Sequence, residues 1–561
     1  MFDTSLKQLL EKGGAQGNGA HAEPSKMVLV EEKELLELKH NAGYWRSLHE
    51  RSIKREGKLK KVILGQKALI RDLRNRVFGK KSEKKGSVKD KGNPKPKNPP
   101  RPRGQQKGSK GHGRTRHDDL PKKIERHPLP SESDKCPKCG KAYSPHGSED
   151  VEIIEVEVKA YKRVIKRCRG KQDCTCEGVP KTIIAPTVPR ILPRNPYGIS
   201  IWMQVLLNKF LYSQPTNRLL ESYNELELRI SPGTITDGLK KLVPMLAPVY
   251  ETLFERQMTE DRFHNDESGW KVFEAIDGKI GNRWWLWVSR SSSVVFFQIA
   301  PGRGADVPVT HFFANQHDKI IVVCDRFSAY KSMAKQLDFI VLAFCWAHVR
   351  RDFLDTARSF PNLEGWAMTW VEMIAEIYHI NNQRCTLFDK NQPLNDQSHG
   401  FHKLHSKLQG TMAQMHEKFT TFINEHIGDV KNKPENAVHH TAKLKVLSSL
   451  NNHWEGLNVF VEHPDVLMDN NNAERSIRNP VTGRKNYYGS GSVWSSELAA
   501  IMFSIFQTLK LWGINCTHWL EVYLTACADN NSQSPENLKS FLPWEMDEQR
   551  LQALSKAPDT S

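Results

Sequence analysis

Three acidic residues that are far apart in the sequence have the surroundings of catalytic carboxylates. Asp266 lies near the end of an expected strand, and Asp325 follows the apolar run Ile320–Cys324, 59 positions later (325 − 266). Glu474 lies 149 positions further on (474 − 325), just inside an expected helix. Converging carboxylates raise one another's pKa, and divalent cations relieve that repulsion. We therefore expect these three residues to hold two Mg²⁺ or Mn²⁺ ions, which prefer oxygen ligands and support phosphodiester cleavage.

Each acid also has an ordinary structural interpretation. Asp266 could be a turn residue, and the adjacent Glu267 is a rival ligand. Glu474 and Arg478 have the i,i+4 spacing of a surface ion pair, which stabilises a helix by about 0.2–0.5 kcal/mol. Basic residues that follow the third acid are placed to neutralise phosphates, and they are Arg475, Arg478, Arg484 and Lys485.

Strands and helices must bring these acids together. We expect strands, one helix and two further strands in the order Phe263–Asp266, Trp284–Ser289, Val294–Ala300, Val307–Ala314, Ile320–Cys324 and Phe339–Phe344, with another helix before the last strand. That order is typical of the ribonuclease-H-like α/β fold, in which strand ends gather the site. Residues 261–351 and 465–505 would form this catalytic domain. Residues 352–464 would be a large helical insertion before the last catalytic helix, which Asn472 can cap.

The whole chain has 561 residues and a formal net charge of +18. Its length indicates about three or four domains. The longest apolar run, Phe339–Ala347, is nine residues, and the N-terminus has no apolar signal core, so we expect neither a membrane protein nor an exported one. Five of its ten cysteines lie between positions 136 and 176, which indicates metal ligation in a reducing cytoplasm rather than disulfides.

The positive charge is concentrated in one segment. Between Gly79 and His117, 14 Lys or Arg residues face only Glu83 and Asp90, a net charge of +12. Such a segment attracts DNA or RNA by releasing condensed counterions, although a solvated linker has the same composition. Residues 79–120 are also rich in proline and glycine, which predicts a basic, semi-extended linker. Its candidate DNA contacts are Lys95, Lys97, Arg101 and Arg103.

The N-terminal part divides into two segments. Residues 1–30 are polar and rich in glycine, which predicts disorder. Residues 31–78 predict a coiled-coil-like helix, which either pairs two protomers or packs on its own chain. The partial heptad consists of Trp45, Leu48, Leu59, Val62, Leu69 and Leu73.

Cysteine spacing predicts a small zinc-binding domain at residues 121–190. Cys136 and Cys139 form one knuckle, and Cys174 and Cys176 would complete a tetrahedral site. Cys168 is the alternative ligand, with His127 or His146 as further options, and buried free thiols are the competing interpretation. Residues 151–166 alternate like a pair of strands that would bring the two cysteine groups together.

Residues 197–260 predict an all-helical region. One helix is expected at Gln214–Leu226, and Ser231 and Pro232 then start a second at Ile235–Leu246. Two helices across a turn match a DNA-binding helix-turn-helix, and they also occur for packing alone. Residues 506–530 predict a C-terminal helical piece, followed by a tail at 531–561.

Several ordered motifs resemble those of transposases of the insertion-sequence sixty-six family, the large TnpC-type protein. The motifs are His264-Asn-Asp-Glu-Ser-Gly-Trp270, Cys324-Asp-Arg-Phe-Ser-Ala-Tyr330, Cys345-Trp-Ala-His-Val-Arg-Arg351, Asn471-Asn-Ala-Glu-Arg-Ser-Ile-Arg478 and Gly483-Arg-Lys-Asn486. By this resemblance residues 197–505 are the family's DDE transposase domain. The helix before Phe78 is similar to its leucine-zipper segment, the cysteine knuckle to its zinc-binding domain, and the segment from Leu511 to its C-terminal helical piece.

The resemblance implies a DDE recombinase in which Asp266, Asp325 and Glu474 hold two magnesium ions. Water would cut double-stranded DNA at the terminal inverted repeats of a mobile element, and the freed 3′ hydroxyl would attack target DNA. It also implies accessory proteins of the same element, and two element ends held together call for a homo-oligomer. We expect such a protein at the nucleoid in a bacterial cytoplasm. The second cysteine group, Cys168–Cys176, is longer than the family pattern.

Two other functions remain open at this point. A metal-dependent nuclease of the same fold would cleave DNA without strand transfer. A zinc and helix-turn-helix DNA-binding protein would have the same basic segment but only structural acids.

Overall fold

The computed structural model describes residues 31–78, 124, 137–142, 153, 154, 156, 158–173, 177, 178, 180–426 and 437–556. The chain divides into two units, residues 1–79 with 424–444 and residues 80–423 with 445–561. The first unit contains the 47-residue helix α2, Glu32–Phe78. Heptad side chains such as Trp45, Leu59 and Leu69 are exposed on it. Pairing of this helix with a second protomer stays a prediction.

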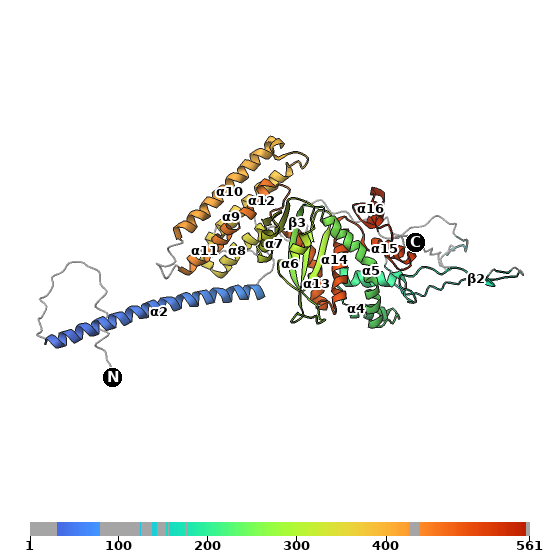
Figure 1. Cartoon of the computed structure of the whole chain (residues 1–561), viewed down its shortest axis with the longest axis horizontal. Coiled ribbons are helices and arrows are strands. Elements are labelled where there is room, and N and C mark those ends of the chain that lie inside the picture. The colour runs from blue at the N-terminus through green and yellow to red at the C-terminus, as the bar shows by residue number, and fades with distance from the viewer. Residues whose placement is uncertain are drawn as a thin grey trace. The chain divides into compact units, whose positions relative to one another are not determined.

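A five-stranded sheet forms the centre of the second unit (Figure 1). Its strands are β3 (Arg262–Lys271), β4 (Arg283–Arg290), β5 (Val295–Ala300), β6 (Ile320–Cys324) and β7 (Ile340–Phe344). They lie in the order β5-β4-β3-β6-β7. The first three pair antiparallel, whereas β6 pairs parallel with both β3 and β7. The expected mixed α/β fold is therefore confirmed, and the strand order is consistent with a ribonuclease-H-like sheet.

One strand of this sheet is longer than the sequence predicts. The expected strand ends at Asp266, but β3 continues to Lys271, so that Asp266 lies in its middle. All eight residues of β4 pair with β3, from His264 opposite Arg290 to Lys271 opposite Arg283. The polar run after Phe263 thus remains extended because a complete antiparallel partner satisfies its backbone.

Helices cover both faces of the sheet. Helices α6 (Asp306–Phe312) and α7 (Ser328–Gln336) lie on one side, and α13 (Asn471–Tyr487) and α14 (Val493–Leu511) lie on the other (Figure 1). Phe263 of β3 packs edge-on against Phe312 of α6, with ring centroids 4.9 Å apart. Trp270, seven residues later, packs against Phe503 of α14 at 5.8 Å. Odd and even positions of β3 therefore face different layers.

Helix α14 also closes the outer edge of the sheet. The backbone amide of Phe297 on β5 donates to the Ser504 hydroxyl at 2.8 Å, and that of Val295 donates to the Thr508 hydroxyl at 3.0 Å. These amides point away from β4, where an edge strand normally exposes them. Two hydroxyl groups of α14 thus accept hydrogen bonds from backbone amides of β5 that could otherwise pair with a strand of another chain.

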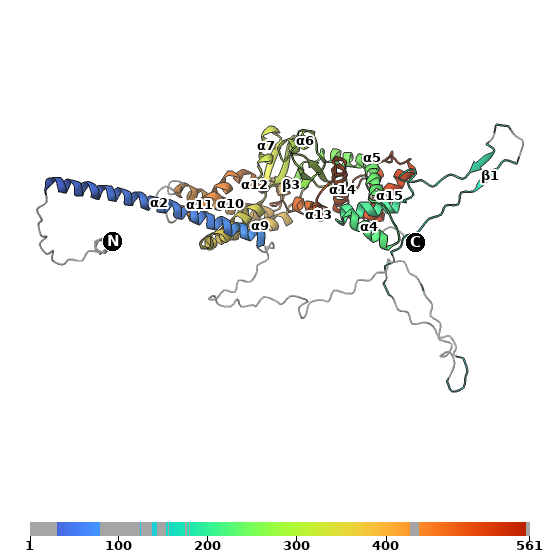
Figure 2. The same ribbon diagram turned by 90° about the horizontal axis from the view of Figure 1, so that it is seen from below.

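A helical region precedes the sheet (Figure 2). It comprises α3 (Ile199–Leu206), the π-helical turn η2 (Leu207–Leu211), α4 (Thr216–Glu225) and α5 (Pro232–Gln257). The expected cap is present, since the Ser231 hydroxyl accepts from the Thr234 amide at 3.2 Å. The expected end at Leu246 is wrong, because α5 continues through Pro244 and Pro248 to Gln257. Its apolar face is buried along its whole length, so the prolines do not end it.

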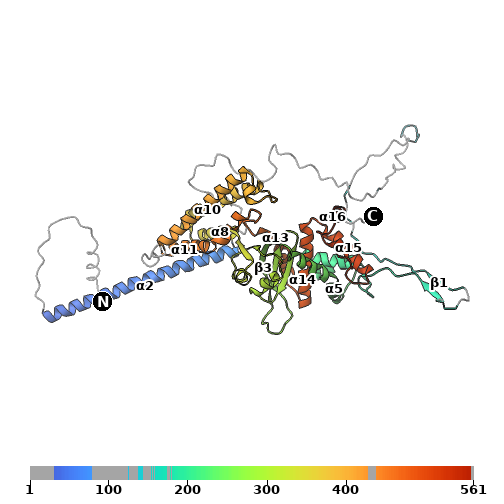
Figure 3. The ribbon, with the colours of Figure 1, turned by 45° about the horizontal axis from the view of Figure 1, so that its top comes forward.

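Further helices occupy the insertion and the C-terminal part. Between β7 and α13 they are α8 (Trp346–Ser359), η3 (Pro361–Leu363), α9 (Glu364–Thr386), η4 (Leu394–Asp396), α10 (His399–His426), α11 (Ala437–Asn452) and α12 (Trp454–Glu462). After α14 come α15 (Cys516–Asp529), η6 (Lys539–Phe541) and α16 (Glu548–Ser555), and Figure 3 shows α15 beside α5 and α14. No helix in the described ranges is long and apolar enough to cross a membrane.

A short two-stranded sheet flanks part of the second cysteine group, with one strand before Cys174 in the sequence and the other after Cys176. Strand β1 (Arg169–Lys171) pairs antiparallel with β2 (Thr182–Ile184). The strand pair expected at 151–166 is not found at the described positions of that segment. The strands instead begin after it.

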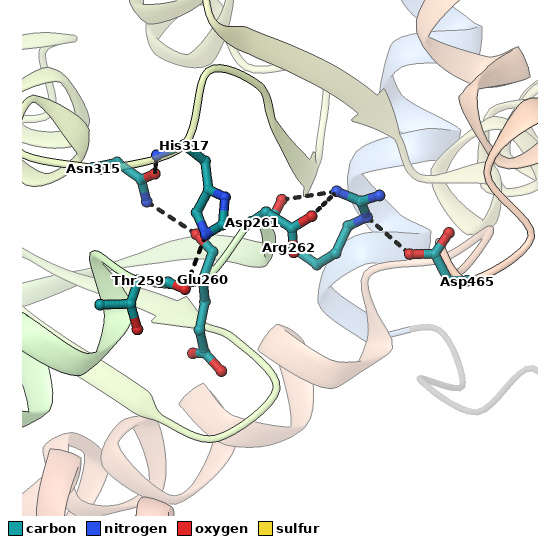
Figure 4. A network of polar contacts seen from close by, with 7 residues as sticks. All are labelled: Thr259, Glu260, Asp261, Arg262, Asn315, His317 and Asp465. Carbon is teal, nitrogen blue, oxygen red and sulfur yellow. Dashed lines mark hydrogen bonds and ion pairs between the residues drawn. The ribbon is translucent and has the colours of Figure 1, made fainter. Parts of the chain in front are cut away.

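A polar network fixes the start of β3 (Figure 4). Arg262 contacts Asp261 at 2.6 Å and Asp465 at 2.9 Å. His317 lies 2.9 Å from the carbonyl oxygen of Thr259. Because Asp465 belongs to the segment that leads into α13, the network joins the start of β3 to the approach of α13.

Candidate active site

The sheet register places two of the three acids at the same level. His264 of β3 pairs with Val323 of β6 in the parallel ladder. Counting two residues further on both strands reaches Asp266 and Asp325. In parallel strands such residues lie side by side, on the same face of the sheet. The carboxylates predicted from distant segments are therefore brought to neighbouring positions.

Asp266 lies in an electronegative, buried environment. Burial raises its pKa to about 8, and the adjacent carboxylate of Glu267 adds to this effect. The charges of Glu474 and Asp325 act in the same direction. The hydrogen bond that Asp266 receives comes from the backbone amide of Glu267, at 2.9 Å. The other two predicted acids therefore both act electrostatically on Asp266.

Asp325 has a conventional position directly after a buried strand. All five residues of β6 are buried, which explains why the strand reads as an uninterrupted apolar run. The Asp325 carboxylate accepts a hydrogen bond from the Phe327 amide at 2.9 Å, just before α7 begins. This bond orients the carboxylate and leaves its second oxygen available to a ligand.

Glu474 reaches the site on the first turn of α13, whose cap differs from the prediction. The N-cap is Asn470 rather than Asn472. Asn470 is 1 % exposed, and its side-chain amide donates to the carbonyl oxygen of Asn265 at 2.6 Å. Its side-chain oxygen lies 3.3 Å from the His264 ring nitrogen Nδ1. Asn470 therefore fastens the start of α13 to β3, beside Asp266.

The two ends of the helical insertion are bonded to each other. The Trp346 amide, at the start of α8, donates to the carbonyl oxygen of Met468 at 2.9 Å. The Asn470 amide contacts the Cys345 sulfur at 3.2 Å. The chain thus leaves the sheet after β7 and returns to the same place before α13, which brings Glu474 back to the acids.

His348 is a neighbour of the site that spacing alone did not identify. Its Nε2 atom lies 4.0 Å from Oε1 of Glu474. Burial lowers the pKa of its ring, and the charges of Glu474 and Asp325 oppose that shift. In the part of the chain that the structure describes, Glu474 forms no ion pair with Arg478. The surface-pair interpretation of Glu474 is therefore not supported.

Glu267, the rival ligand, points to the opposite face. Its carboxylate is 2 % exposed, and it contacts Arg303 at 2.6 Å. The Tyr330 hydroxyl donates to its second oxygen at 2.7 Å. Both oxygens therefore have side-chain partners, of which Tyr330 is buried, whereas Asp266 has no side-chain partner within the described ranges.

The donor chemistry of the three acids suits a hard divalent cation. Their ligand atoms are carboxylate oxygens, and no Lys or Arg of the described segments forms an ion pair with them. Within those segments, however, no group of three or more His, Cys, Asp or Glu side chains is arranged to hold a metal ion. The acids share one region of the sheet without forming a closed coordination shell.

The four basic residues of α13 differ in their surroundings. Arg484 contacts the Ser268 hydroxyl at 3.1 Å and the carbonyl oxygen of Gly269, so it fastens α13 to β3. Arg475 donates to the Asn472 side chain at 2.9 Å and is exposed. Arg478 and Lys485 are also exposed. Their positions, four and eleven residues after Glu474, place them on the same helix face as that acid.

Other predicted site residues lie largely outside the described residues. These are Cys136, Cys174 and Cys176, and in the basic segment Lys95, Lys97, Arg101 and Arg103. Cys139 and Cys168 are described, and both are exposed free thiols. The zinc site and the basic segment therefore stay predictions.

Comparison with known proteins identifies relatives over the region that contains the acids. A family model described as "Transposase IS66 family" matches residues 194–497, which include the sheet and all of α13. The uncharacterized protein y4jD of Sinorhizobium fredii (strain NBRC 101917 / NGR234) is 24 % identical, over 76 % of this chain and 81 % of its own. The uncharacterized protein y4hP of the same strain is 23 % identical, over 73 % of each chain. No solved structure matches.

Proposed function

Because the chain belongs to the IS66 family of transposases, we propose that it is a DDE-type enzyme that cuts DNA at the ends of a mobile element and joins them to target DNA. Family membership itself implies DNA binding and transposition. The proposal adds the cleavage chemistry, its residues and strand transfer.

The observation that supports it is the grouping of three acids, none of which forms an ion pair with a Lys or Arg of the described segments. Asp266 and Asp325 are level in adjacent parallel strands, and Asn470 holds the helix that carries Glu474 against the first of them. Burial raises the pKa of Asp266, the charges of Glu474 and Asp325 add to this effect, and a bound cation would offset their repulsion. We assign Asp266, Asp325 and Glu474 as the ligands of two Mg²⁺ or Mn²⁺ ions.

The chemistry that two such cations supply when bound is activation of an attacking hydroxyl and stabilisation of the leaving oxygen of a phosphodiester. The chain's own residues contribute position and charge. Asp325 is oriented by the Phe327 amide, and Asn470 positions Glu474 through β3. Arg478 and Lys485 lie on the Glu474 face of α13, where they would neutralise phosphates on either side of the cut bond. Arg475 is a further phosphate contact in this proposal, and Arg484 positions the helix.

The remaining parts have roles that follow from the same proposal. The basic segment around Lys95, Lys97, Arg101 and Arg103 would hold double-stranded DNA at the terminal inverted repeats. Zn²⁺ on Cys136, Cys139, Cys174 and Cys176, with Cys168 as the alternative ligand, would stabilise the small domain before the helical region. Helix α2 would pair protomers so that two element ends are cut together.

The test is the substitution Asp266→Asn in the full-length protein. We expect it to reduce Mg²⁺-dependent cleavage of element-end DNA at least 1,000-fold, because the substitution removes one charged metal ligand, while DNA affinity stays within a few-fold. Asp277→Asn, an exposed aspartate between β3 and β4, is the matched control and should cleave like the parent.

Unchanged cleavage by Asp266→Asn would refute the assigned role of this acid. A parent protein that binds the DNA but never cleaves it would favour the zinc and helix-turn-helix binding protein. A strand-transfer assay with a pre-cut end separates the remaining candidates, because a plain nuclease leaves that end unjoined.

A further inference from the structure

A pocket of about 520 Å³ lies apart from the three acids. Its walls are η2, the first turns of α4, α5 and α14, and the loop between α13 and α14. Figures 1 and 2 show α4, α5 and α14 gathered at the same end of the second unit. Tyr487 lines the pocket from the last turn of α13, whereas Glu474 lies on the first turn. The thirteen positions from Glu474 to Tyr487 (487 − 474) span about 20 Å of helix.

One wall of the pocket carries a cation without an anionic partner. The Lys209 ammonium forms no hydrogen bond or ion pair within the described ranges, and it lies 4.6 Å from the Tyr487 ring centroid. Burial lowers its pKa to about 8. Lys209 belongs to the π-helical turn Leu207–Leu211, a distortion that often accompanies functional sites. An anion in the pocket would supply the partner that this ammonium lacks.

Helix N-termini add to this positive potential. Helix α4 begins after Pro215, and no side chain caps it. Thr216 and Asn217 of its first turn line the pocket, and their backbone amides have no partner in the described segments. The corresponding amide of α14, at Val493, already donates to the Glu274 carboxylate at 2.6 Å. Uncapped N-terminal amides are typical binding groups for phosphate, so α4 is positioned for an additional anion.

The rest of the pocket is apolar and larger than a phosphate needs. Leu220, Ile235, Leu239 and Leu498 line it, and Trp494 adds an indole ring. Its volume is within the range of sites for small organic ligands. Aromatic and apolar walls beside a cation are also the features that hold a base and its phosphate in single-strand binding sites. The occupant that combines an anion with an aromatic body is a nucleotide.

We propose that this pocket holds one nucleotide of a DNA strand, with its phosphate between Lys209 and the N-terminus of α4 and its base against the apolar wall. This inference rests on the proposed function, because the strand is taken to be part of the DNA that the protein cuts. At 3.4 Å per nucleotide along a strand of B-DNA, the 20 Å length of α13 corresponds to about six nucleotides from the acids. The pocket would therefore fix the register of the strand relative to the bond that is cut.

The experiment uses the full-length protein and hexathymidylate with one thymine replaced by 5-iodouracil. Salt is raised until binding by the basic segment 79–117 is suppressed. We expect ultraviolet crosslinks at Tyr487 or Trp494. Lys209→Met should lose these crosslinks and weaken hexathymidylate binding at least tenfold, whereas Lys335→Met, an exposed lysine on α7, should change binding less than twofold. Thr236→Trp, which narrows the pocket without changing charge, should also weaken binding.

Several outcomes would overturn the inference. Crosslinks elsewhere, or parent-like binding by both Lys209→Met and Thr236→Trp, would exclude the pocket as a strand site. Thymidine 5′-monophosphate or inorganic phosphate binding as tightly as hexathymidylate would make it a site for free anions. Asp266→Asn should bind hexathymidylate like the parent. Lys209-dependent binding by a parent that never cleaves DNA would therefore contradict the proposed function alone.

Discussion

The two faces of β3 hold adjacent carboxylates in opposite situations. Glu267 faces α7, where Arg303 forms an ion pair with it and the Tyr330 hydroxyl donates a hydrogen bond to it. Asp266 faces α13, receives one backbone hydrogen bond, and has the charges of Glu474 and Asp325 nearby. On one face of β3 the carboxylate has partners from its own chain, and on the other face the neighbouring side chains are negatively charged. The difference teaches that, of two adjacent carboxylates, the one without a side-chain partner in the described residues is the better candidate for a ligand.

The largest effect that tests this comparison is on folding stability in the absence of divalent cations. Glu267→Ala should lower the free energy of unfolding by roughly 3 kcal/mol, because it leaves the buried Tyr330 hydroxyl and Arg303 without their acceptor. Asp266→Ala should not lower it, because the substitution removes a repelled charge. Urea titrations with chelator present measure both values. Equal losses for the two variants would contradict the distinction between the faces.

Lowering the pH should destabilise the packing on the face of the sheet that holds Glu267, called here the closed face. His311 of α6 is buried beside Phe254 and Phe312, with its Nε2 atom 3.1 Å from Gln257. Burial lowers the pKa of this histidine from 6.5 to about 4. The unfolded chain therefore takes up the proton first as the pH falls below 6.5. The contribution of His311 to stability should therefore decline down to about pH 4, by about 3 kcal/mol, whereas protonation of Asp266, whose pKa is raised, acts in the opposite direction.

The measurement is urea unfolding of the parent and His311→Gln at pH 7 and pH 4.5. The substitution keeps a polar partner for Gln257, and it should reduce the loss between the two pH values. His399→Gln, at an exposed histidine, should leave it unchanged. An identical pH dependence in the parent and His311→Gln would show that the closed face admits the proton without penalty.

A smaller effect on the free energy of unfolding is expected on the face of the sheet that holds Asp266, the open face. Asn470→Ala removes the buried hydrogen bond to the carbonyl oxygen of Asn265 and should cost about 1–3 kcal/mol. Cleavage should fall by at least tenfold even where the variant is fully folded, because Glu474 loses its anchor. Asn471→Ala, one residue further on and exposed, is the matched control for both measurements. Parent-like cleavage by Asn470→Ala would mean that other contacts position Glu474.

The sequence predicted the core strands because their buried side chains form runs of consecutive apolar residues. The run Ile320–Cys324 is buried throughout, so its end at Asp325 could be located directly. The extension of β3 to Lys271 could not, since its polar residues are kept extended by pairing with β4. The continuation of α5 past Leu246 and through Pro248 was missed for a similar reason, because packing of its apolar face outweighs the proline.

The N-cap of α13 shows how far the site could be predicted from the sequence. The segment Asp469–Asn472 offers several residues that cap helices equally well by type. Asn470 is selected by contacts with β3, which lie about 200 positions away in the sequence. His348 was overlooked because nothing in its spacing connects it to Glu474. Such choices are made by tertiary packing rather than by local sequence.

Hydrogen bonds join the two ends of the helical insertion, from Trp346 to Met468 and from Asn470 to Cys345. These bonds bear on how the segment can change in evolution. A long segment whose two ends are fastened together imposes only a slowly growing entropic penalty as it lengthens. Material gained or lost between these anchors would leave the acids where they are. Relatives can therefore differ in the length of this segment without displacing the acids beside it.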